Sequence, residues 1–179
     1  FLGVDDYDVT NLHTVGLRAN GKTSGFDYGL ELAYQFGDAD SLGVGFAPVG
    51  GLYGDDEASY GNWAGELTLG YTFEDVKWTP RVYLLGAYFG SEDNRDVSWA
   101  EWLNPFDRPK ASVSFNRLFS DVNYLPVIND NGWLSNFSSL ALGAQFKPTE
   151  QVLVNLQVAK AWVVEPFDYP AMFRLGRFY

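Results

Sequence analysis

The chain has 179 residues with a net charge of −11, one histidine and no cysteine. This length suits one domain, and the acidic balance argues against a nucleic-acid partner, which needs a basic face. Without cysteine there are no disulfides or thiolate metal sites, and because a lone histidine offers little further chemistry we predict no catalytic residue, no metal site and no cofactor.

Alternation of apolar and polar residues predicts six strands, at residues 12–20, 26–36, 63–73, 81–90, 138–146 and 152–159. Most have about the 9–11 residues that a tilted strand needs to cross a bilayer. The second is the clearest, because its apolar face begins at Phe26 and ends at Phe36, as in lipid-facing strands with aromatic residues at both interfaces. The fourth is the least regular, because alternation places the aromatic residues Tyr83 and Phe89 on the same face as the charged Arg81.

The connections alternate in length. Residues 21–25, 75–78 and 147–150 are short turns, and residues 37–60 and 91–133 are long loops, which is typical of an outer-membrane barrel. No run of about 18 apolar residues indicates a transmembrane helix, and a barrel needs none. We therefore predict an all-β fold, an antiparallel up-and-down transmembrane β-barrel with about six to eight strands. One domain over residues 1–179 is expected, as a segment of a larger barrel that is incomplete at both ends.

The long loops carry 12 of the 23 acidic residues, so much of the acidity lies outside the barrel wall. Simple solvation and a role in binding calcium or lipopolysaccharide both account for these acids. The second loop is also rich in aromatic residues, which are too apolar to lie free in water. We expect some of them to extend the strands and some to fold inward or over the mouth, among them Trp99, Trp102, Phe106, Phe115, Phe119, Tyr124 and Trp133.

The polar face of the predicted strands holds the candidate functional residues. Pore walls must be hydrated, and charged side chains on them select the ions that pass. The alternative is that these groups only pair across neighbouring strands, Arg18 with Glu31 and Glu66 with Arg81. The candidates for the lumen lining are Arg18, Glu31, Gln35, Glu66, Thr68, Arg81, Gln145, Asn155 and Gln157.

Several segments, in this order and spacing, carry a resemblance to a known family. They read LHTVGLR (12–18), GFDYGLELAYQFG (25–37), GELTLGYTF (65–73), WTPR (78–81) and FNRLFSDVNY (115–124). They resemble the alginate-export outer-membrane protein family over about residues 9–165. The resemblance implies a monomeric barrel in the Gram-negative outer membrane that exports an acidic exopolysaccharide through an arginine-rich constriction. It also implies that Arg18 and Arg81 match basic positions of that channel and that Arg117, a further candidate for the lumen lining, lies in the matching loop.

The predicted function is therefore export, not catalysis. The implied partners are an anionic, alginate-like polysaccharide, outer-membrane lipid and lipopolysaccharide, and periplasmic export partners, with no nucleic acid. Two alternatives stay open: a general outer-membrane porin, and a small closed eight-stranded barrel that acts as an adhesin or structural protein. A soluble barrel that binds a ligand is disfavoured by the aromatic residues at both ends of the apolar face. An enzyme is disfavoured because no serine is recognisably placed to meet His13.

Overall fold

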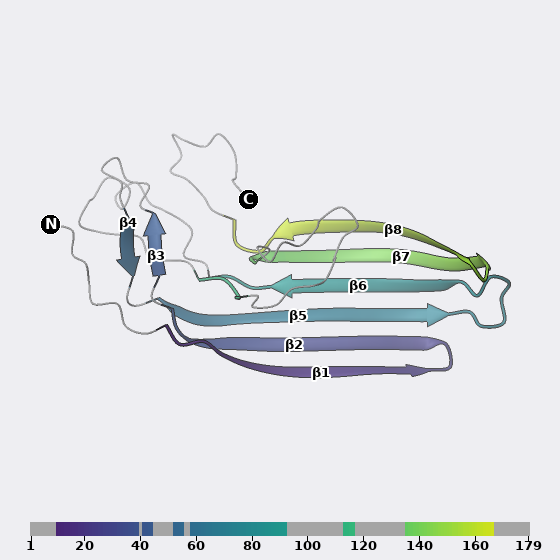
Figure 1. The fold of residues 1–179 in the computed structure, drawn as a ribbon, viewed down its shortest axis with the longest axis horizontal. Coiled ribbons are helices and arrows are strands. Elements are labelled where there is room, and N and C mark those ends of the chain that lie inside the picture. Colours follow the sequence, from purple (N-terminus) through teal and green to yellow (C-terminus); the bar gives the residue numbers. More distant parts are fainter. Residues whose placement is uncertain are drawn as a thin grey trace, which may run out of the picture.

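The computed structural model describes residues 10–39, 41–44, 52–55, 58–92, 113–116 and 135–166, and all regular structure in these ranges is β. Six strands form one antiparallel sheet in the order β1-β2-β5-β6-β7-β8, and two short strands form a separate hairpin (Figure 1). No helix in these ranges is long and apolar enough to span a membrane. The large sheet consists of β1 (His13–Thr23), β2 (Phe26–Asp38), β5 (Ser59–Thr72), β6 (Arg81–Phe89), β7 (Phe137–Thr149) and β8 (Val152–Val163). The hairpin consists of β3 (Ser41–Val44) and β4 (Leu52–Asp55).

The predicted alternation of short and long connections is confirmed. Residues 24–25, 73–80 and 150–151 join the strands at one end of the sheet, here called the turn end. Ser24 and Gly25 have φ angles of 46° and 81°, the two positive values of a type I′ hairpin turn, whose twist matches that of the strands. The long connections lie at the opposite end, the loop end, where Figure 1 also shows the β3–β4 hairpin.

The six predicted strands are all present, with ends that differ by a few residues. The largest difference at a strand start is in β5, which begins at Ser59 because its pairing with β2 continues to Asp38. The β3–β4 hairpin was not predicted. Each of its strands has only four residues, which is too short a stretch to show an alternating pattern.

One face of the large sheet is apolar from β1 to β8. The register aligns Leu17 with Leu32, and Leu84 with Leu142, which in turn faces Val158. These side chains are open to the surroundings: Leu17 is 63% exposed, Leu142 64% and Val158 79%. A sheet in water buries such a face, whereas a strand of an outer-membrane barrel presents it to lipid. The face is therefore consistent with a membrane-embedded wall.

Aromatic residues border the aliphatic band at both ends. Tyr34 and Trp63 lie at the loop end with ring centroids 4.5 Å apart, and Tyr71 and Phe73 lie at the turn end with centroids 4.9 Å apart. The outermost rings of this face on β2 are Phe26 and Phe36, ten positions apart in the sequence. This separation corresponds to about 33 Å along the strand, or about 25 Å along the membrane normal at a strand tilt of about 40°. This height matches the apolar band of an outer-membrane barrel.

Residues 113–116 of the long β6–β7 connection lie against the opposite, polar face at the loop end. The backbone of Phe115 donates to the carbonyl of Gly90 at 2.9 Å, and its ring lies 6.0 Å from that of Phe89. Phe115 is 7% exposed and packs in a cluster with Ala64, Phe89 and Phe137. The expectation that part of this loop folds inward is thereby confirmed for residues 113–116, while the other aromatic residues named above from this loop lie outside the described residues.

The large sheet is open. Within the described part of the chain, β1 pairs only with β2 and β8 pairs only with β7, so each presents one unpaired edge. The sheet is thus all-β, antiparallel and up-and-down, and consistent with part of a barrel that is not closed by these six strands.

Candidate functional site

The register places the candidate residues of the strands on one face, in rows that cross the sheet. Arg18, Glu31 and Glu66 are direct neighbours on β1, β2 and β5, and this row is called the middle row. Four residues towards the turn end, Lys22 pairs with Asp27 and Asp27 with Gly70. This second row, which also receives the Arg81 side chain, is called the turn-end row.

Arg81 joins β6 to β2 across β5. Its Nε donates to Asp27 Oδ1 at 3.0 Å and one terminal nitrogen donates to Oδ2 at 2.5 Å, so the guanidinium binds the carboxylate at two points. Such paired contacts fix geometry as well as adding energy. The intervening residue is Gly70, and a Cβ atom there would lie 2.6 Å from Asp27 Oδ1. The glycine therefore makes room for the ion pair.

Tyr83 extends this network to the last strand. The Arg81 guanidinium lies 5.1 Å from the centre of the Tyr83 ring, and the Tyr83 hydroxyl donates to Asn155 Oδ1 at 2.7 Å. Gln157 Oε1 is 3.4 Å from the same hydroxyl. The ring crosses Gly143, where an added Cβ would lie 2.7 Å from Tyr83 Cε1. An aromatic ring over a strand glycine covers the exposed backbone and fixes the register.

The middle row is more open than the turn-end row. Arg18 Nε lies 3.7 Å from Glu31 Oε2, with the two side chains 76% and 57% exposed. The cross-strand pair of Arg18 with Glu31, considered above as the alternative, is therefore present. The expected pair of Glu66 with Arg81 is wrong, because the register sets Glu66 opposite Ala87 while Arg81 lies opposite Thr72 and binds Asp27.

Gln35 lies on the predicted face but is only 2% exposed. Its Nε2 donates to the carbonyl of Asn116 at 2.7 Å, and the amide of Asn116 donates to Gln35 Oε1 at 2.6 Å. Asn62 Nδ2 holds the same segment by donating to the carbonyl of Val113 at 2.8 Å. In this structure Gln35 therefore anchors residues 113–116 and does not meet water.

A comparison with protein families gives one match, to the alginate export family, over residues 4–168. The chain belongs to the alginate export family. No curated protein and no solved structure matches the chain. Alginate export proteins form a family of outer-membrane channels and not of enzymes, so the class of this protein is exopolysaccharide transport across the outer membrane.

On the polar face of this alginate export protein, charges are balanced and unevenly distributed. The paired positions on this face hold three cations and three anions, all on β1, β2, β5 and β6, namely Arg18, Lys22, Arg81, Asp27, Glu31 and Glu66. The same face of β7 and β8 carries Gln145, Asn155 and Gln157 among small residues. No group of three or more His, Asp or Glu side chains that could hold a metal ion occurs among the described residues.

Sequence reasoning missed the residues that organise the turn-end row. Each of Lys22, Asp27 and Tyr83 lies an even number of positions from a predicted residue of its own strand, so all three are on the predicted face. The alternation of the sequence could therefore have identified them. Gly70 could not have been recognised, because its role depends on a contact between strands on either side of it. Thr68 lies half-buried on the predicted face, and Arg117 lies outside the described residues.

Proposed function

We propose that this protein exports an anionic, alginate-like exopolysaccharide through a charged, hydrated lumen. The observation that carries the proposal is the division of the sheet into two faces. Exposed aliphatic side chains lie on one face between two aromatic rows, and six charged side chains lie on the other, while Lys160 lies on the apolar face. A wall with lipid on one side and water on the other makes this division favourable.

The proposed lumen lining consists of Arg18, Glu31, Glu66, Thr68, Arg81, Gln145, Asn155 and Gln157. Gln35 is covered by residues 113–116, and Arg117, a further proposed lining residue, lies outside the described residues. Arginine suits the passage of carboxylates because its planar group offers two donors and stays charged at any working pH. Conduction requires binding that is weak and spread over several sites. Glu31, 3.7 Å from Arg18, supplies this moderation by competing for the same guanidinium.

Reversal potential of the full-length protein in a planar bilayer under a salt gradient tests the proposal. We expect anions to pass better than cations and soluble uronate oligomers to reduce the current. Arg18→Gln should weaken the oligomer effect about two- to fivefold, as expected for the loss of one exposed charge contact. Lys160→Gln, the same charge change on the apolar face, should leave both readings unchanged.

The balance of three cations and three anions favours a second candidate, a general porin. A wall without net charge gives little preference for anions. Cation preference in the bilayer, with no response to uronates, would contradict export and leave the general porin. The exported polymer, the localisation to the outer membrane and any periplasmic partners are parts of the same proposal.

A further inference from the structure

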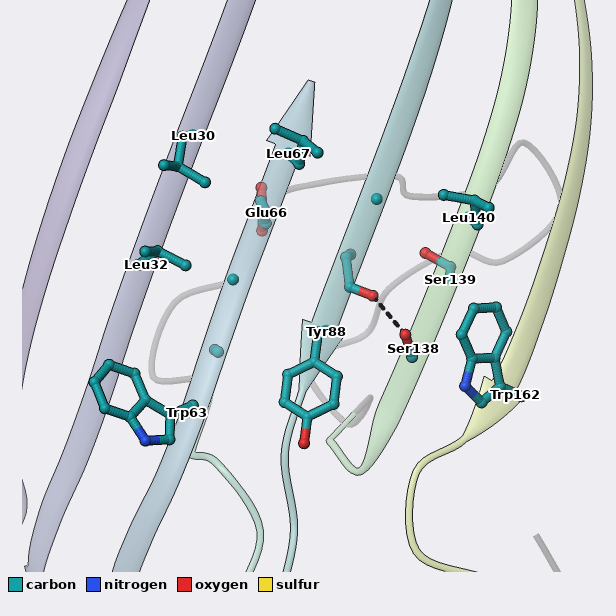
Figure 2. A pocket seen from close by; sticks show the side chains of 14 residues that line it. Leu30, Leu32, Trp63, Glu66, Leu67, Tyr88, Ser138, Ser139, Leu140 and Trp162 are labelled. Carbon is teal, nitrogen blue, oxygen red and sulfur yellow. Dashed lines mark hydrogen bonds between the residues drawn. The ribbon is translucent and has the colours of Figure 1, made fainter. Parts of the chain in front are cut away.

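The apolar face contains a hollow of about 350 Å³ near the loop end. Its floor includes Gly65 and Gly86, the two positions of this part of the face that carry no side chain. Leucines border it towards the middle of the sheet, among them Leu32, Leu67 and Leu140 (Figure 2). An added Cβ at Gly86 would lie 3.9 Å from Leu67 Cβ and Leu140 Cδ1, so the space above this glycine is open.

Three rings border the hollow on the side of the loop end. Figure 2 shows Trp63, Tyr88 and Trp162 in line below the leucines. Tyr88 is 43% exposed and Trp162 44% exposed, so these rings reach outward from the wall. Ser138 lies between Tyr88 and Trp162 in the register, but its hydroxyl donates to the carbonyl of Ala87 at 3.0 Å and is buried. The Ser138 hydroxyl is therefore not available to a ligand, and the surface of the hollow is mainly apolar.

A positive charge lies beside the hollow on the same face. Lys160 pairs with Leu140, a lining residue, and its ammonium is 5.9 Å from the centre of the Trp162 ring. Lysine on a lipid-facing strand extends its stem along the apolar surface and places its charge at the interface. Lys160 forms no ion pair with a carboxylate of the described residues. Its charge is thus directed to the level where lipid headgroups lie.

We propose that the hollow and Lys160 bind a phosphorylated glycolipid of the outer leaflet, with an acyl chain in the hollow and a phosphate at Lys160. The loop end of an outer-membrane barrel faces outside, and the lipid of that leaflet is the phosphorylated, multiply acylated glycolipid of lipopolysaccharide. Charge complementarity selects this anionic class over neutral lipid. The proposal rests on the membrane placement of the sheet but not on which polymer the lumen carries.

Native mass spectrometry of the delipidated full-length protein, titrated with lipid A, tests the site. Lys160→Gln should weaken binding about fivefold, the effect of about 1 kcal/mol for one basic residue near a lipid surface. Gly86→Leu should weaken it about tenfold, because the new side chain occupies the hollow from a position where an added Cβ has no neighbour closer than 3.9 Å. Lys77→Gln is the matched control, since Lys77 lies 5.3 Å from the Trp78 ring at the turn end, away from the hollow, and it should bind like the wild type.

Two further arms separate the phosphate from the acyl chain. Lipid A without phosphate should bind the wild type about fivefold more weakly, and Lys160→Gln should then cause no additional loss. Inorganic phosphate in large excess should not displace lipid A. Equal retention of lipid A by both variants and the wild type would overturn the proposal. So would equal binding of phosphatidylglycerol, displacement by inorganic phosphate, or an equal loss in Lys77→Gln.

Discussion

Gly70 shows how one residue without a side chain determines a contact between two others. The rule for neighbouring strands pairs residues that lie directly opposite, and it led to the pair of Glu66 with Arg81. The register sets Thr72 and not Glu66 opposite Arg81, and because Gly70 leaves its position empty, Arg81 reaches over β5 to Asp27 on β2. Parity correctly predicted the face on which these residues lie. It could not predict the partner, which depends on the empty volume above the strand between them.

Gly70→Ala should destabilise the full-length protein by about 1–2 kcal/mol, because the new Cβ displaces a partly buried, two-point ion pair. Gly29→Ala is the control, since its Cβ would lie 3.7 Å from Thr68 Cβ in ordinary contact. That change should be neutral or slightly stabilising, as alanine is favoured over glycine in a strand. Urea unfolding in lipid vesicles measures both variants. Equal effects of the two substitutions would show that the ion pair contributes nothing.

At the scale of elements, the main unexpected contact is between β2 and residues 113–116. Alternation correctly predicted β2 and its polar face, which includes Gln35. It could not predict that Gln35 makes two hydrogen bonds to the backbone of Asn116, 81 residues away. A loop segment without alternation gives no signal for the strand that it will contact. The sequence suggested only that so many aromatic residues would not remain in water.

Gln35→Ala should release residues 113–116 from the sheet. The change leaves the amide and carbonyl of Asn116 without their partner in a buried place, at a cost of about 1–3 kcal/mol. Hydrogen exchange of a peptide that includes residues 113–116 should become faster. Gln145→Ala, on the same face but paired with Arg81 at the turn end, should leave that exchange rate unchanged. Unchanged exchange in Gln35→Ala would mean that other contacts hold the segment.

The facing of the strands gives a second prediction at this scale. Spin labels at Leu30, Leu67, Leu69 and Leu142 should be accessible to lipid-soluble oxygen, because these residues share the apolar face. Labels at Glu31, Glu66, Thr68 and Gln145 should be accessible to a water-soluble relaxation agent. The full-length protein in vesicles is the sample. The opposite pattern of accessibility would indicate a soluble barrel with an apolar interior.

At the scale of the whole molecule, fold class was easier to predict than closure. Strand length, alternation and the sorting of long and short connections all follow from local sequence, and the structure confirms them. Closure depends on which strands pair at the two ends of the sheet, and no local pattern encodes that. The open edges of β1 and β8 need partners, because unpaired backbone groups in lipid cost several kcal/mol each.

The 179-residue chain alone should therefore not form a stable barrel in detergent. Closed outer-membrane barrels migrate differently on gels before and after boiling, and this chain should migrate identically under both conditions. A longer chain whose further strands pair with the open edges of β1 and β8 should show the difference. A compact, heat-modifiable monomer of the isolated chain would instead favour the small eight-stranded barrel.

The distance between the two charged rows affects long and short molecules differently. Asp27 and Glu31 are four residues apart on β2, so the rows lie about 13 Å apart along the strand. A small anion occupies one row at a time and returns to bulk water between contacts. On the proposed function, a uronate chain longer than this spacing contacts both rows at once and exchanges these contacts one at a time. Under this proposal, such a chain would keep one contact while the other exchanges, so the wall would retain a long uronate chain and release a small anion.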